Sequence, residues 1–234
     1  MAVEDMKANA DQAERLHRFT HDLRNRLASM HQAVGQLAID DSPESIALRE
    51  FAEQQYFKAM RATEELLDDL GVDRGTGAIK TVPIDLSALT RRCISDLDHR
   101  FTRKEQRVVI AGNEALQVVG DPLWLEQLVT ALLTNASKFS GPGTSITVRL
   151  GTSGDHAELN VIDEGVGLSS GDLEKIFVRY AWLDSRSTAN EPQGRSTLAR
   201  AHQWAEIHGG TLHARSEGPG KGSCFALRLP VKVD

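Results

Sequence analysis

The hydrophobic pattern of this chain changes its period near residue 71, and that change constrains the fold more than any other feature. Before it, apolar residues recur every three or four positions, which is the spacing of a buried helix face. After it, short runs rich in branched residues alternate with helical stretches. The segment between, GVDRGTGAIKTVP at 71–83, has the glycine and proline content of a linker. The sequence therefore predicts a helical domain at residues 1–72, a linker at 73–82 and an α/β domain at 83–234.

Two helices are expected in the first domain, from about 5 to 39 and from about 43 to 70, because DDSPES at 40–45 interrupts the pattern with a proline and capping residues. Their predicted buried stripes are Leu16, Phe19, Leu23, Leu27, Met30, Val34 and Leu37, then Leu48, Phe51, Ala59, Ala62, Leu66 and Leu70. We expect an antiparallel helical hairpin. Because Phe57, Met60 and Leu67 lie on a different face, they predict either a four-helix bundle formed by dimerisation or packing against the neighbouring domain.

In the second domain, six runs have the pattern of strands and three stretches have the pattern of helices. The strand candidates are RVVIAG, LQVVG, SITVRL, AELNVID, TLHARS and CFALRLP, and the helices are expected near 86–101, 121–139 and 197–208. This order predicts an α/β sandwich, with one mixed sheet and helices over one of its faces. The segment EGPGKGS at 217–223 is expected to form a hairpin between the last two strands.

The charge pattern argues against a nucleic-acid or membrane-surface partner. The net charge is −6 and the basic residues are scattered; the best cluster, HRFTRK at 99–104, is expected to be the solvated end of a helix. Cys93 and Cys224 lack the spacing of a zinc or redox site, which favours a reducing, cytoplasmic location. No apolar run approaches the length of a membrane span, so we expect any sensor or anchor to lie outside this chain.

The stretch HDLRNRLASM places a histidine away from the apolar stripe of its own helix. His21 lies about 160° from the centre of that stripe, and Asn25 follows one turn later on nearly the same line. Both side chains should therefore face a partner or solvent. The adjacent Asp22 can orient and deprotonate the imidazole of His21, as a base does for a nucleophile. An exposed, inert histidine is the alternative, and it fits the seven other histidines of the chain.

Two further motifs stand in the second domain. LLTNASKFS places Asn135 and Lys138 three apart on the polar side of an apolar helix, and VIDEGVGLS ends a strand with Asp163, Gly165 and Gly167. Together with IFVRY and HGGTLHARSEGPGKGSCFALRLP, in this order, they resemble the nucleotide-binding domain of the GHKL ATPases, specifically the sensor histidine kinases. HDLRNRLA is similar to the phosphoacceptor box of those kinases.

The resemblance implies a role for each of these residues. The Asp163 carboxylate accepts a hydrogen bond from the adenine amino group, and Gly165 and Gly167 let the backbone approach the base. Asn135 offers its amide oxygen to Mg²⁺, and Lys138 adds a cation near the ATP phosphates. A turn-forming aspartate is the alternative for Asp163.

In the first domain, the resemblance makes His21 the acceptor of the γ-phosphoryl group and Asp22 its base. Asn25 matches the family position linked to phosphatase action on the partner. Arg24 and Arg26 contact phosphate or the partner, with helix-surface charge an equal alternative.

This chain departs from the family pattern at several positions. Arg26 replaces a proline that bends the helix below the histidine. Four positions before Asn135, where related hydrolases carry a water-activating glutamate, this chain has Ala131, which argues against a free-standing ATPase.

The glycine-rich lid box of the family is represented here by QGRSTL at 193–198. Gly194 is displaced by one position from a glycine of the family pattern. Arg195 and Thr197 replace glycines whose amides would face phosphate. Thr197 is expected to obstruct that approach, whereas Arg195 can replace it with a charge-assisted contact.

The sequence thus predicts a dimeric two-component histidine kinase that phosphorylates His21 from ATP with Mg²⁺ and passes the group to an aspartate of a response-regulator receiver domain. The altered lid leaves one alternative, an ATP-blind or ATP-impaired phosphotransferase or phosphatase that acts on the same partner.

Overall fold

The structure is a computed structural model of the chain of 234 residues. It describes residues 79–112, 115–179 and 197–231, together with residues 181, 183, 185 and 188 and single positions between residues 19 and 63. The chain divides into two compact units, Met1–Gly77 and Ala78–Asp234. The point of division falls inside the segment 73–82.

In the first unit, every described residue between 19 and 30 and between 44 and 63 is helical. Ser42 caps the second of these stretches, since its hydroxyl accepts a hydrogen bond from the Ser45 amide at 3.2 Å. Four side chains of the predicted buried stripes are exposed in the single chain, with exposed fractions of 61%, 66%, 67% and 57% for Phe19, Met30, Leu48 and Phe51. The hairpin itself and the remaining stripe positions lie outside the described residues.

At these four positions the predicted stripes are therefore not buried within a single chain. A helix buries an apolar face only where a neighbouring element covers it, and large apolar side chains left in water lose that stabilisation. Leu23 and Leu27, from the same stripe, are half-buried.

Five strands of the second unit form one mixed sheet, as the strand pattern predicts. In spatial order they are β2 (Arg107–Ala111), β4 (Ser145–Ser153), β5 (His156–Asp163), β7 (Ser223–Pro230) and β6 (Thr211–Arg215). β2 is parallel to β4, and the other neighbours are antiparallel. The register of β5 and β7 places Asp163 opposite Ser223. The segment 216–222 joins β6 to β7, which confirms the expected hairpin.

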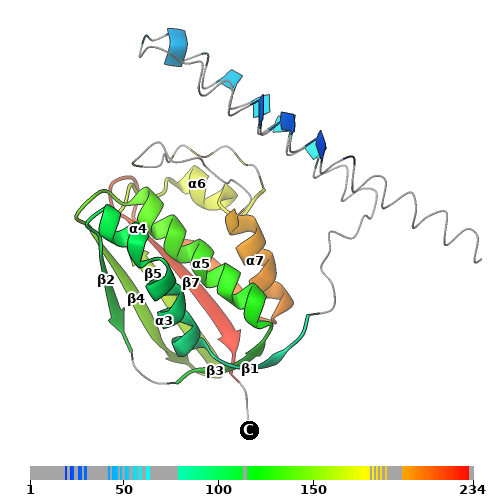
Figure 1. Ribbon diagram of the computed structural model, residues 1–234, viewed down its shortest axis with the longest axis vertical. Helices are drawn as coiled ribbons and strands as arrows, with labels where there is room; N and C mark the ends of the chain where they lie inside the picture. The colour runs from blue at the N-terminus through cyan, green and yellow to red at the C-terminus, as the bar shows by residue number, and fades with distance from the viewer. Residues whose placement is uncertain are drawn as a thin grey trace, which may run out of the picture. The chain divides into compact units, whose positions relative to one another are not determined.

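The helices of this unit cover one face of the sheet (Figure 1). They are α3 (Leu86–Asp96), α4 (Asp98–Arg103), α5 (Pro122–Phe139) and α7 (Thr197–Ile207), while the short α6 (Ser170–Lys175) follows β5 in sequence. The core lies between these layers, and α5 contributes Leu125, Leu128 and Leu132, all fully buried. The helix expected at 86–101 is interrupted at Leu97, whose φ of −94° and ψ of 2° end α3.

The expectation of a single sheet is wrong at one strand. β3 (Gln117–Gly120), the LQVVG run, pairs antiparallel with β1 (Val82–Asp85) in a separate two-stranded sheet. Gly112 follows β2 with a φ of +100°, which favours glycine, and a Cβ there would meet the Leu150 carbonyl oxygen at 2.0 Å.

His208 joins the ends of two helices. Its Nε2 accepts a hydrogen bond from the Asp121 amide at 2.9 Å, so its Nδ1 carries the proton and donates to the Trp204 carbonyl at 2.6 Å. Asp121 is the N-cap of α5, and its side chain accepts hydrogen bonds from the Leu123 and Trp124 amides. The neutral imidazole therefore ties the start of α5 to the end of α7.

We expect His208→Ala to lower the free energy of unfolding by about 0.5–1.5 kcal/mol, because the half-buried Asp121 amide loses its acceptor. Urea denaturation of the whole chain measures this difference. His213→Ala removes an exposed histidine on β6 and is the matched control. An equal decrease in the free energy of unfolding of the two variants would show that the His208 contact between α5 and α7 does not stabilise the fold specifically.

Candidate functional site

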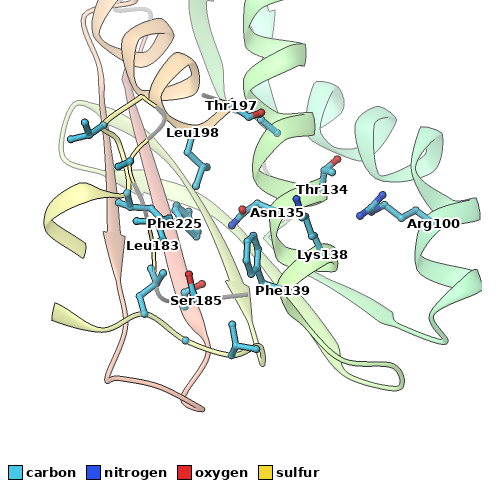
Figure 2. A pocket seen from close by; sticks show the side chains of 18 residues that line it. Arg100, Thr134, Asn135, Lys138, Phe139, Leu183, Ser185, Thr197, Leu198 and Phe225 are labelled. Carbon is cyan, nitrogen blue, oxygen red and sulfur yellow. The ribbon is translucent and has the colours of Figure 1, made fainter. Parts of the chain in front are cut away.

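A cavity of about 400 Å³ lies between α4, α5, the start of α7, β7 and the segments that follow β5 and α6. Figure 2 shows the side chains that line it. A volume of this size is within the usual range of small-molecule sites.

The lining of the cavity has an apolar and a polar side. The apolar side comes from the segments after β5 and α6, from α7 and from β7, and comprises Leu168, Ile176, Val178, Ala181, Leu183, Leu198 and Phe225. α4 and α5 contribute the polar side, with Arg100, Thr134, Asn135 and Lys138, while the polar residues Ser185, Thr197 and Ser223 line the cavity from other segments. Such a lining suits a ligand with an apolar group at one end and a charged group at the other.

Asn135 and Lys138 reach this cavity because of the way α5 packs. The leucines of α5 face the core, so the helix turns its remaining face, including Ala131, toward the cavity. Lys138 is buried, and its Nζ lies 5.6 Å from the centroid of the Phe139 ring. The two residues that the sequence pairs are thus brought together on one wall.

Asp163 ends β5 and has an exposed fraction of 4%. Its Oδ1 accepts hydrogen bonds from the Gly165 amide at 2.9 Å and the Ser223 amide at 3.2 Å, and its Oδ2 accepts one from the Ser223 hydroxyl. Burial raises the pKa of the Asp163 carboxyl, and the hydrogen bonds from Ser223 and Gly165 partly offset this. Ser223 lines the cavity directly, and Asp163 lies behind it.

Gly165 and Gly167 meet the protein's own backbone. A Cβ at Gly165 would lie 2.6 Å from the Phe139 carbonyl oxygen. Gly167 has a φ of +68°, and a Cβ there would lie 2.1 Å from the Gly218 carbonyl oxygen. Gly167 also lines the cavity. Packing of the segment after β5 therefore explains both glycines in this structure, whatever a ligand adds.

The carboxyl end of α5 is held by side chains that local sequence patterns do not reveal. Lys104 Nζ donates to the carbonyls of Ser137 at 2.7 Å and Ser140 at 3.2 Å, and Gln106 Nε2 donates to the same two carbonyls at 3.0 and 3.1 Å. The Thr188 hydroxyl donates to the Ser140 carbonyl at 2.8 Å. These partners are 31 to 48 positions apart in the chain, so no spacing rule connects them.

The basic cluster HRFTRK is therefore only partly the solvated helix end that composition suggests. Arg103 is exposed as expected, but Arg100 lines the cavity and Lys104 satisfies the carbonyls at the end of α5. Helix carbonyls without internal partners attract cations, which explains the position of Lys104.

Thr197, the first residue of α7, lines the cavity beside Leu198. Gly194 and Arg195, its predicted partners in the lid box, lie outside the described residues. His21 and Asn25 lie outside them as well. Asp22 is described, and it is helical and exposed.

Comparison with known proteins agrees with this geometry. Residues 120–233 match the family model described as histidine kinase-, DNA gyrase B- and HSP90-like ATPase. TcrY of Mycobacterium tuberculosis, named as a probable sensor histidine kinase, is 34% identical over 220 residues, which are 91% of this chain and 44% of TcrY. The sensor protein ChvG of Agrobacterium fabrum is 30% identical over 232 residues, which are 91% of this chain and 38% of ChvG.

Among solved structures, the mycobacterial sensor histidine kinase MprB superposes with a TM-score of 0.57 and 28% identity, over 65% of this chain and 100% of that chain. The fold, the cavity and the matched family model define the second unit as an ATPase domain of the GHKL class. The relatives that match along most of the chain show, further, that it is a catalytic region of the sensor histidine kinase family. The chain spans less than half the length of the two relatives, 44% and 38%. In the part of the chain that the structure describes, no helix is both long and apolar enough to span a bilayer.

We expect Asp163→Asn to change how stability depends on pH. Because burial raises the folded-state pKa of Asp163 above its ordinary value of 3.8, the folded protein holds this proton more tightly than the unfolded chain does. The contribution of Asp163 to the free energy of unfolding of the wild type therefore falls as pH rises from that ordinary value through the raised pKa. An asparagine side chain does not titrate, so the variant should gain stability relative to the wild type across this window.

Urea denaturation of both proteins at several values between about pH 4 and about pH 7 measures the difference. Asp96→Asn, which removes an exposed carboxylate at the end of α3, is the control and should not show this relative gain. Parallel curves for the wild type and Asp163→Asn would contradict the prediction.

Proposed function

We propose that this chain is an ATP-dependent protein-histidine kinase of a two-component system. It binds ATP with Mg²⁺ in the cavity of the second unit, phosphorylates His21 in a dimeric helical hairpin, and passes the phosphoryl group to an aspartate of a response-regulator receiver domain. The observation that carries the proposal is one cavity in which Ser223 lines the wall in front of Asp163 and Asn135 and Lys138 lie on the polar side.

The apolar side fits adenine. A carboxylate offers about four acceptor positions, and the three donors from Gly165 and Ser223 leave about one for an exocyclic amino group. The flat base would pack among the side chains of Leu168, Ile176 and Phe225.

The polar side fits the phosphates with their metal ion. The Asn135 amide oxygen is a hard, neutral ligand of the kind Mg²⁺ takes, and Lys138 supplies a positive charge on the same wall. Mg²⁺, when bound, would neutralise charge on the phosphates and so favour attack at the γ-phosphorus. Lys138 would orient the phosphate chain, and the apolar side would hold the base away from water.

His21 would receive the phosphoryl group. A bond forms between His21 Nε2 and the γ-phosphorus while the bond from that phosphorus to the bridging oxygen breaks, and ADP leaves with the electron pair. As this bond forms the ring becomes cationic, and Asp22 would accept the proton of the other ring nitrogen, which leaves the phosphorylated imidazole neutral. Asn25 would orient a water molecule for a second reaction, the removal of phosphate from the phosphorylated partner.

A dimer is supported by the uncovered apolar side chains of the first unit. Phe19, Met30, Leu48 and Phe51 are large and exposed in the single chain, and a second copy of the hairpin would bury them in a four-helix bundle. A cytosolic location is supported by the two free cysteines, which form no disulfide. The name of TcrY, a probable sensor histidine kinase, favours a kinase over the ATP-blind alternative.

The first test is a phosphorylation assay with γ-labelled ATP and Mg²⁺. The wild type should take up a label that is lost in acid and kept in base, as expected for a phosphorus–nitrogen bond. His21→Gln should abolish the label, whereas His31→Gln, a change in the same predicted helix, should keep it. Retention of the label in His21→Gln would rule out His21 as the acceptor.

The second test concerns the dimer. Light scattering of the whole chain should give twice the mass of one chain, whereas Phe19→Asp combined with Met30→Asp should give the mass of a monomer, because charges would then be buried at the interface. Val109→Asp combined with Leu123→Asp changes exposed apolar residues of the second unit and should leave the dimer intact. A wild type that stays monomeric at every concentration contradicts this part of the proposal.

A further inference from the structure

Arg100 lies on the polar side of the cavity although no sequence motif points to it. It belongs to α4, a short helix that precedes β2, and its side chain is half-buried with the Nε atom shielded from solvent. Figure 2 shows its guanidinium directed toward α5, where Thr134 and Lys138 lie. The next arginine of the helix, Arg103, is exposed and does not line the cavity.

The described residues give this cavity a net positive lining. Among them, Arg100 and Lys138 are the cationic side chains that line it, and no aspartate or glutamate of the described set joins them. A guanidinium stays charged at every pH the protein would meet, and it recognises phosphate with two parallel donors. A ligand that carries several negative charges is therefore favoured at this end.

The order of the residues along the cavity indicates which phosphate Arg100 meets. Phe225 and Leu183 mark the apolar side, and in Figure 2 Asn135 and Lys138 lie between them and Arg100. A nucleotide with its base on the apolar side and its metal-bound phosphates beside Asn135 would extend its last phosphate toward α4. Ala131, also in the lining, offers no polar atom that competes for that phosphate.

We propose that Arg100 binds the terminal phosphate of the nucleotide and makes the site prefer a triphosphate to a diphosphate. This inference rests on the proposed function, because it takes ATP as the ligand of the cavity. Arg100 is a binding and positioning residue in this scheme, since it holds the phosphoryl group that is to be transferred and breaks no bond itself.

The test compares Arg100→Gln with Arg103→Gln in the whole chain. The two substitutions remove the same charge from the same helix, but Arg103 does not line the cavity. Calorimetric titration with Mg²⁺ and the β,γ-imido analogue of ATP, with ADP and with adenosine measures three affinities for each protein. Thermal unfolding without nucleotide checks that each variant is folded.

We expect Arg100→Gln to weaken binding of the ATP analogue by about tenfold to about a hundredfold, the worth of one charge-assisted hydrogen bond. The affinity for ADP should fall much less and that for adenosine should not change. Arg103→Gln should match the wild type with all three ligands. Arg100→Lys, which keeps the charge without the fork of donors, should recover part of the lost affinity.

Two results would overturn the inference alone. Equal weakening of all three ligands in Arg100→Gln would mean that Arg100 only supports the fold of the site, and wild-type affinity for the ATP analogue would mean that Arg100 does not meet the phosphate. If the wild type binds none of the three ligands, the proposed function fails and the inference fails with it.

Discussion

The packing of α5 against the five-stranded sheet is the interaction on which the rest of the second unit depends. Leu125, Leu128 and Leu132 are fully buried on one face of the helix, and truncation of such a leucine typically costs about 2–5 kcal/mol. Burial of these leucines fixes the rotation of α5 about its axis. The directions in which Asn135 and Lys138 project are then fixed as well, because each position on a helix has a set angle to the others. The same helix thus stabilises the domain and builds the polar side of the cavity.

Both ends of α5 are fixed by contacts from distant parts of the chain. The start is capped by Asp121, whose own amide is bonded to His208 at the end of α7. The last carbonyls accept hydrogen bonds from Lys104 and Gln106, so the end is not left to fray. A helix that is held at both ends keeps its side chains in one orientation. A ligand that contacts several of these side chains at once requires such a fixed arrangement.

Under the proposed function, stability and ligand recognition oppose each other at the buried carboxylate of Asp163. Burial raises its pKa and disfavours the charged form, yet an acceptor without a proton is what an amino group of a ligand needs. Ser223 offsets part of this cost, and it lies beside Asp163 only because β5 and β7 pair in this register. A shift of one residue would turn Ser223 to the other face of the sheet.

The sequence predicts the parts of this structure that local patterns encode. The period of the apolar residues predicts α5, α7 and the strands of the main sheet. The motifs indicate Asn135, Lys138 and Asp163 as candidate site residues. Ser223, Lys104 and Thr188 are missed because each acts on a partner far along the chain, and a lone serine or lysine carries no periodic signal. β3 is found as a strand but assigned to the wrong sheet, because alternation reveals a strand and not its neighbour.

Ala131 bears on which reaction this cavity supports. It lines the cavity one helical turn before Asn135, at the position from which the related hydrolases present a glutamate to activate water. A methyl group there cannot remove a proton from a water molecule beside the γ-phosphate. Under the proposed function the nucleophile brings its own base, and the adjacent His21 and Asp22 are the proposed pair. Transfer to a side chain, as proposed, is therefore better matched to this cavity than hydrolysis is.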